Sequence, residues 1–288
     1  MRSILVPVAD RPECQAALKQ AFKIADELSA SVTGCHLRPQ REESRRSRER
    51  HFLLQFGRDN GESKKLSGKQ VDLRSTAARR LFTGIAKSRD FQLVERPVLG
   101  KSRCAMWYEM VGSLDRLFRI AGPVTDFSIL SRPKRKSSGQ AVEFVLSAVL
   151  HSGKPVMILP QKGVRSVGSN VLIAWNQSIE AARAVTAALP LLVRAESVTI
   201  CSCGPENSVG PKSSALVNYL KMWGVKSRRV STRGHDVKDE LRETYKESGS
   251  DLVVMGAYSR NRLREVVFGG MTEHMLFHSN MPVFMQYG

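Results

Sequence analysis

The sequence lacks the features that mark membrane-spanning and secreted proteins. No apolar run approaches the roughly 18 residues that a membrane helix needs, and the longest, residues 144–150, is interrupted by Ser147. The chain begins with apolar residues, but Asp10 and Arg11 follow before the core of a signal peptide could form. We therefore expect a cytoplasmic protein that is not associated with a membrane.

Cysteine is also scarce. The five cysteines are an odd number, are scattered and include no CxxC pair, so the pattern predicts neither a disulfide framework nor a zinc site. Cys201 and Cys203 stand at the end of a predicted strand, where the alternation of side chains directs both thiols to the same face. We interpret this pair as ordinary packing in preference to a metal or redox role, and we predict no metal site.

The motifs of familiar catalytic mechanisms are missing as well. The sequence contains no GxSxG elbow, no GxxxxGK[ST] loop and no pair of carboxylates with evident acid and base roles. Glu273, His274 and His278 share one helical face, but the glutamate precedes the first histidine and no third metal ligand is apparent. We therefore expect no enzyme activity, and slow ATP hydrolysis stays open as an alternative.

Acidic residues are outnumbered by basic ones. The chain has 45 Lys and Arg against 27 Asp and Glu, a formal charge of +18 that attracts anions. Residues 41–90 hold fourteen basic residues against seven acidic ones and so contribute +7. A second basic run covers residues 132–136. We interpret both runs as solvated segments, and the alternative is a nucleotide-free interaction protein that binds an acidic partner or nucleic acid through them.

What the sequence does contain is one module twice. Each copy begins with a strand, a helical pattern and a second strand that opens with Ser-Val-Thr, and each copy later has an Asp-led strand, a helix and a Pro-led strand. The corresponding segments are residues 4–8, 13–28, 31–35, 126–130 and 155–159 in the first copy, and residues 171–175, 179–194, 197–201, 251–255 and 282–286 in the second.

Strands that alternate with helices predict a parallel sheet with helices on both faces. We therefore expect an α/β fold with two tandem domains, residues 1–163 and 168–288, each an open five-stranded Rossmann-like sheet. The first copy is longer by about 41 residues, from the difference between 95 and 54 positions at matching points. We place this basic insertion within residues 40–80.

The second copy ends with a loop suited to a phosphate group. Gly256 would let the chain turn tightly at the end of its strand, and Gly269 and Gly270 would let backbone amides approach an anion at the start of the last helix. Thr272 would add a hydroxyl group, and arginines within the loop would add positive charge. The stretch predicts a polyphosphate cradle.

This loop resembles that of the universal stress protein family, whose nucleotide-binding members carry Gly-x2-Gly-x9-Gly-Ser/Thr between the fourth strand and the last helix. Gly256 and Gly269 match the first and third glycines, whereas Ser259 replaces the second glycine and Gly270 replaces the Ser or Thr. Thr272 matches a further hydroxyl residue of the family. The likeness is to the tandem form with two domains in one chain, and it extends over nearly all of the chain outside the insertion.

The resemblance implies a non-catalytic regulatory or protective protein of the stress response that binds ATP or another adenine nucleotide in its second domain. Asn176, at the place of a family aspartate, would meet the adenosine. The first copy has Ala9 there and no glycine spacing, so we expect it not to bind. The resemblance also implies that the two final strands pair in an internal pseudo-dimer, with a homodimer as a further option. The residues expected to hold phosphate are Gly256, Ser259, Gly269, Gly270 and Thr272.

Overall fold

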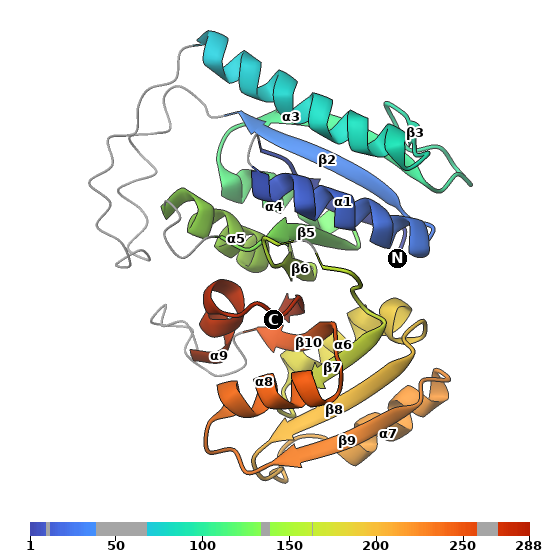
Figure 1. Ribbon diagram of the computed structural model, residues 1–288, viewed down its shortest axis with the longest axis vertical. Coiled ribbons are helices and arrows are strands. Elements are labelled where there is room, and N and C mark those ends of the chain that lie inside the picture. The colour runs from blue at the N-terminus through green and yellow to red at the C-terminus, as the bar shows by residue number, and fades with distance from the viewer. Residues whose placement is uncertain (10–11, 39–67, 134–138, 163, 258–269) are drawn as a thin grey trace. The chain divides into compact units, whose positions relative to one another are not determined.

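The computed structural model describes the chain except for residues 10–11, 39–67, 134–138, 163 and 258–269. It divides into two compact units (Figure 1). The first comprises Met1–Lys154 and Gln161–Gly163, and the second comprises Pro155–Pro160 and Val164–Gly288. Within the described part of the chain, no helix combines the length and apolar character needed to cross a membrane.

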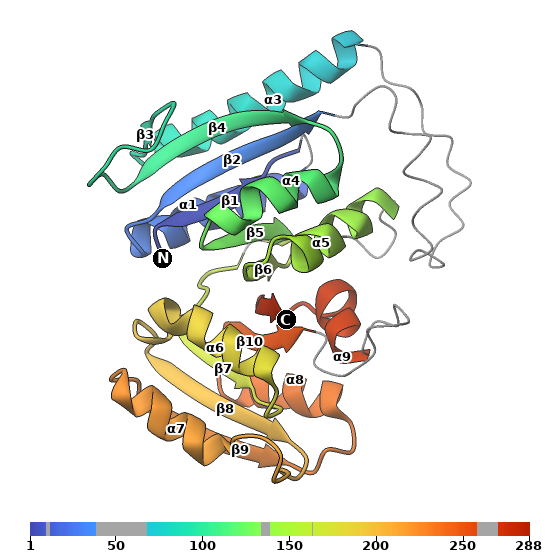
Figure 2. The same ribbon diagram turned by 180° about the vertical axis from the view of Figure 1, so that it is seen from behind.

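The first unit is built on five parallel strands in the order β3, β4, β2, β1, β5. Helices α1 and α3 cover one face (Figure 1), and α4 and α5 cover the opposite face (Figure 2). The elements are β1 (Ser3–Pro7), α1 (Pro12–Glu27), β2 (Ser31–Arg38), α3 (Gly68–Ser88), β3 (Gln92–Leu93), β4 (Cys104–Val111), α4 (Leu114–Ala121), the 3-10 turn η1 (Gly122–Val124), β5 (Phe127–Ser131) and α5 (Gly139–His151).

Helix α3 shows where the predicted insertion ends. Residues 39–67 lie outside the described residues, but Ser75, Ala78 and Phe82 of α3 are at least 95% buried. Gly34 of β2 lets α3 approach, because a Cβ atom there would lie 2.6 Å from the Phe82 ring. Residues 68–80 of the range given for the insertion therefore belong to a helix that packs into the core of the unit.

Two glycines of the first unit should respond to alanine in opposite directions. Gly84 is an exposed residue inside α3 with open space around its Cβ position, so Gly84→Ala should stabilise the unit by about 0.5–1 kcal/mol. Gly100 has equally open space, but its φ of +75° is strained for alanine, so Gly100→Ala should destabilise by about 1 kcal/mol. Urea unfolding of both variants measures the difference, and changes of the same sign would contradict the argument.

The second unit has five parallel strands and one antiparallel strand, in the order β6, β11, β10, β7, β8, β9. Helices α6 and α7 cover one face (Figure 2), and α8 and α9 cover the other (Figure 1). The elements are β6 (Val156–Leu159), β7 (Asn170–Ala174), α6 (Ile179–Leu192), β8 (Ser197–Cys203), α7 (Ser213–Met222), β9 (Ser227–Thr232), α8 (Val237–Glu247), β10 (Leu252–Ala257), α9 (Gly270–Glu273), the π-helical turn η2 (His274–His278) and β11 (Val283–Tyr287).

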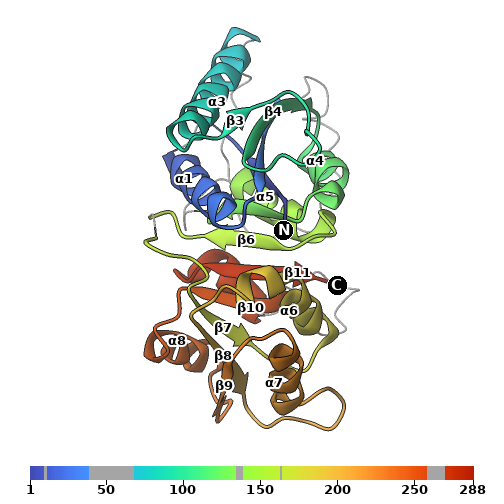
Figure 3. The ribbon, with the colours of Figure 1, turned by 90° about the vertical axis from the view of Figure 1, so that its right-hand side faces the viewer.

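The two final strands pair as the family resemblance implies. Strand β6, the last strand of the first copy, runs antiparallel to β11, with Met157 opposite Phe284. It belongs to the second unit, so that unit has six strands instead of the expected five. Figure 3 views the sheets from the side, with helices on both faces of each. The α/β fold class is therefore as predicted.

The repeat extends to the hydrogen bonds of one residue. Asp126, just before β5, accepts hydrogen bonds from the backbone amides of Arg2 and Ser3. Its counterpart Asp251, just before β10, accepts them from the amides of residues 168–170, at 2.9, 3.2 and 3.0 Å. In the first copy the carboxylate thus joins the start of β5 to the start of β1, and in the second copy it joins the start of β10 to the start of β7.

Candidate functional site

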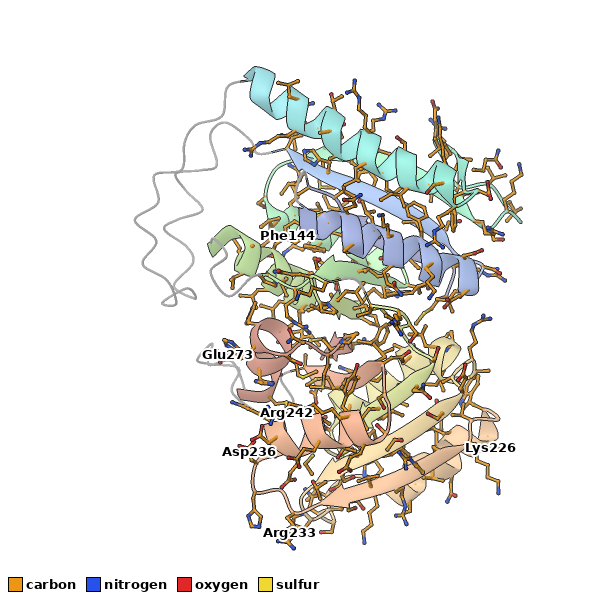
Figure 4. All side chains as sticks on the ribbon, in the orientation of Figure 1. Phe144, Lys226, Arg233, Asp236, Arg242 and Glu273 are labelled. Atoms are coloured by element: carbon orange, nitrogen blue, oxygen red, sulfur yellow. The ribbon has the colours of Figure 1, made fainter. Side chains whose placement is uncertain are left out.

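Loops that follow parallel strands meet at one edge of the sheet, where ligands bind in open α/β folds. In the second unit the described part of this carboxyl edge consists of residues 175–178, 204–212 and 233–236. Residues 258–269, which follow β10 in the chain, lie outside the described residues. In Figure 4, Arg233, Asp236 and Glu273 mark this end of the unit, whereas Lys226 lies at the opposite end, where β9 begins. The candidate site is built from these loops.

Gln177 joins the loops that follow β7 and β8. Its side-chain amide donates to the carbonyl oxygens of Asn207 and Gly210, at 3.0 and 2.9 Å, and its Oε1 accepts from the Asn207 amide at 2.8 Å. Gly210 allows this approach, because a Cβ atom there would lie 2.4 Å from the Gln177 carbonyl oxygen. The indole of Trp175, 5% exposed, donates to the Pro211 carbonyl at 2.9 Å. Trp175 is thus one of the residues that line the carboxyl edge.

Glu206 holds the start of α7. Its Oε1 accepts from the Ser213 amide at 2.7 Å and from the Ser202 hydroxyl at 3.0 Å. Desolvation tends to raise the pKa of this carboxyl, but the hydrogen bonds from Ser213 and Ser202, together with the charge of Arg229, outweigh it and lower the pKa below its ordinary value. Glu206 is therefore ionised at neutral pH and acts as a fixed acceptor for the loop after β8.

Glu240 of α8 does the same for the loop after β9. It accepts from the Thr232 hydroxyl and from the amides of Gly234 and His235, the latter two at 2.8 and 2.9 Å. The hydrogen bond from Thr232 is the main reason that the pKa of Glu240 lies below its ordinary value. A lowered pKa means that this bracing is complete above the ordinary carboxyl range and is lost as the pH falls through the pKa of the folded state.

Gly256 has a different structural role from the one expected. It lies inside β10, opposite Gln286, and does not form a turn. A Cβ atom at this position would lie 2.5 Å from the Ala181 amide nitrogen and 2.6 Å from the Glu180 carbonyl carbon. The expectation of a tight turn at Gly256 was therefore wrong, because the absence of a side chain makes room for the first turn of α6.

The other predicted site residues fall into three groups. Asn176 is exposed directly after β7, and its Oδ1 accepts from the Ser178 amide at 3.3 Å. Gly270 is exposed at the start of α9, whereas Thr272 is 5% exposed and packed inside. Ser259 and Gly269 lie outside the described residues.

Lys238, an exposed residue in the first turn of α8, was not among the site residues expected from the sequence. Its Nζ lies 3.8 Å from the position that a Cβ atom of Gly270 would take, so its charge stands beside the start of α9. The sequence held a usable signal, since Asp236 is a cap residue that places the first turn of α8 after β9. The first turns of helices that follow parallel strands all lie at the carboxyl edge of the sheet.

Two further candidates from the sequence are the Glu273–His278 pair and the second basic run. Glu273 Oε1 lies 4.0 Å from His278 Nε2, and no group of three potential metal ligands occurs among the described residues. In the first unit, residues 134–136 of the second basic run lie outside the described residues, and Arg132 is only 4% exposed. The interpretation of this run as a solvated segment therefore does not hold for Arg132, because it directly follows the buried strand β5 and is enclosed with it.

Comparison with known proteins concerns both the second unit and the whole fold. Residues 168–285 match the model of the universal stress protein family, and no curated protein matches the chain. A universal stress protein from Archaeoglobus fulgidus DSM 4304 is 14% identical with a TM-score of 0.71, covering 99% of this chain and 96% of that chain. A functionally unknown protein from Pseudomonas aeruginosa PAO1 is 14% identical with a TM-score of 0.58, covering 100% and 92%. These likenesses show the fold.

A universal stress protein in complex with cAMP also matches, at 13% identity and a TM-score of 0.35, covering 56% of this chain and 98% of that chain. Nucleotide binding is thereby a property of that protein. The low TM-score carries no inference for the present chain.

Proposed function

From the premise that residues 168–285 belong to the universal stress protein family, we propose that this chain is a cytoplasmic regulatory or protective protein of the stress response. Its second unit binds ATP or another adenine nucleotide at the carboxyl edge, and its role needs no turnover. The observation that supports this best is the position of Lys238, whose ammonium group lies beside Gly270 at the end of the predicted glycine loop.

The groups at this edge have complementary chemistry. Asn176 offers an amide that can donate to and accept from the adenosine. Lys238 offers a point charge for the phosphates, and the exposed backbone of Gly270 can approach them closely. Ser259 and Gly269 complete the proposed cradle. The buried Thr272 is the weakest member of the set, because its hydroxyl would have to become accessible to reach a phosphate.

Calorimetric titration of the purified chain with ATP and with adenosine tests this proposal. Lys238→Ala should weaken ATP binding about three- to tenfold, as expected for one lost charge-assisted contact, and should leave adenosine binding unchanged. Lys246→Ala is the matched control, because Lys246 lies in the last turn of the same helix, away from the carboxyl edge. It should bind both ligands as the unmodified chain does.

Two results would overturn the proposal. The first is the absence of any heat change with ATP, which would favour the interaction protein that binds an acidic partner through its basic segments. The second is an equal loss in Lys238→Ala and Lys246→Ala, which would indicate general charge attraction. Gly269→Val, at the third glycine position of the predicted motif, should abolish ATP binding if the loop forms the cradle.

A further inference from the structure

Cys201 and Cys203 form a close pair of thiols at the end of β8. Strand alternation puts both on the sheet face that α8 covers, and the Cys201 thiol donates to the Thr244 hydroxyl of α8 at 3.8 Å. The two Sγ atoms are 3.7 Å apart. Cys201 is 1% exposed and Cys203 is half-buried, so the pair has a closed inner end and an outer end that solvent reaches.

A metal ion fits this geometry better than a disulfide. Alternate residues of a strand lie about 6.6–6.8 Å apart, at the upper limit of the Cα separation that disulfides tolerate, and the sulfurs would have to approach to about 2.05 Å. A cation held by only two thiolates has a nearly linear S–metal–S angle, so metal–sulfur bonds of about 2.3 Å place the sulfurs about 4.6 Å apart. From the observed 3.7 Å the sulfurs would separate by about 0.9 Å, whereas a disulfide requires them to approach by about 1.7 Å.

The number of ligands selects the class of ion. Among the described residues, no third histidine, cysteine or carboxylate joins the pair to form a metal-binding group. Zn²⁺ in protein sites takes four ligands, whereas soft monovalent cations are stable with two thiolates. We propose that Cys201 and Cys203 form a two-thiolate site that binds one cation of the Cu(I) class. Binding forms two metal–sulfur bonds, and each thiol that is protonated beforehand releases its proton to solvent.

Anaerobic titration of the reduced full-length chain with Cu(I), against a coloured Cu(I) chelator, tests the site. The unmodified chain should take up one tightly bound equivalent of Cu(I). Cys201→Ser and Cys203→Ser should each weaken this binding by at least about 100-fold, because each removes one of only two ligands. Cys14→Ser is the matched control and should bind as the unmodified chain does, since Cys14 lies in α1 of the first unit.

A measurement on the unmodified chain covers the case in which a variant fails to fold. Bound Cu(I) should protect Cys203 from alkylation while Cys14 stays reactive, as peptide mass analysis would show. Wild-type affinity in both serine variants at residues 201 and 203, unprotected Cys203, or displacement of Cu(I) by equimolar Zn²⁺ would each overturn the proposal.

Discussion

Gly256→Ala should lower the free energy of unfolding of the second unit by about 2–3 kcal/mol, whereas Gly270→Ala should change it by less than about 0.5 kcal/mol. The reason is the identity of the neighbouring atoms. A Cβ atom at 256 meets the backbone of α6 at 2.5–2.6 Å, and backbone cannot rotate away as a side chain can. A Cβ atom at 270 meets only the flexible end of Lys238, at 3.8 Å.

Relieving the clash at Gly256 requires α6 to move away from β10. The face of α6 that would lose contact includes Ala181, Ala184 and Val185, each no more than 1% exposed. Urea unfolding followed by tryptophan fluorescence measures the effect, since Trp175 lies beside the start of α6. A Gly256→Ala variant of unchanged stability would contradict the packing role. The presence of glycine at position 256 would then have to be explained by the close approach of an anion alone.

Asp251→Ala should destabilise the second unit by about 2–3 kcal/mol. The carboxylate accepts hydrogen bonds from three successive backbone amides at 2.9–3.2 Å, and its removal leaves these part-buried donors without that acceptor. The start of β7 would then lose its tie to β10, so hydrogen exchange at residues 168–170 should become faster. Asp126→Ala should act in the same way on the first unit, through Arg2 and Ser3.

Asp239→Ala is the control for this prediction. Asp239 forms an exposed ion pair with Arg242 at 2.8 Å in the same unit, and such pairs contribute about 0.5 kcal/mol or less. Urea unfolding of the two aspartate variants compares a carboxylate that joins two strands with one that lies on a helix surface. Equal losses in both would refute the bracing role of Asp251.

Much of the fold followed from local patterns. Strand and helix periodicities repeat at similar spacing in the two copies, so the order of elements and the parallel sheets could be predicted from residues close together in the chain. The same holds for Cys201 and Cys203, since strand alternation alone placed both thiols on one face. The strands that follow Asp126 and Asp251 could also be matched between the copies, although the bracing role of these aspartates could not be predicted.

The candidate site was only partly predictable, because its residues meet through space. Asn176 was located correctly at the carboxyl edge, since the end of the first strand sets its place. Lys238 was missed because its proximity to Gly270 depends on how α8 and α9 cover the sheet. In the sequence the two residues are 32 positions apart (270 minus 238). No local pattern encodes that distance.

The sequence by itself therefore determined the repeated module, the order of elements along each copy and the parallel sheets, because these depend on periodicity along the chain. The tertiary structure decided what particular residues do there. Gly256 admits a helix and Arg132 is enclosed, each through contacts between segments distant in the chain. Such contacts depend on which side chains meet when the layers pack, and only the packed layers show them.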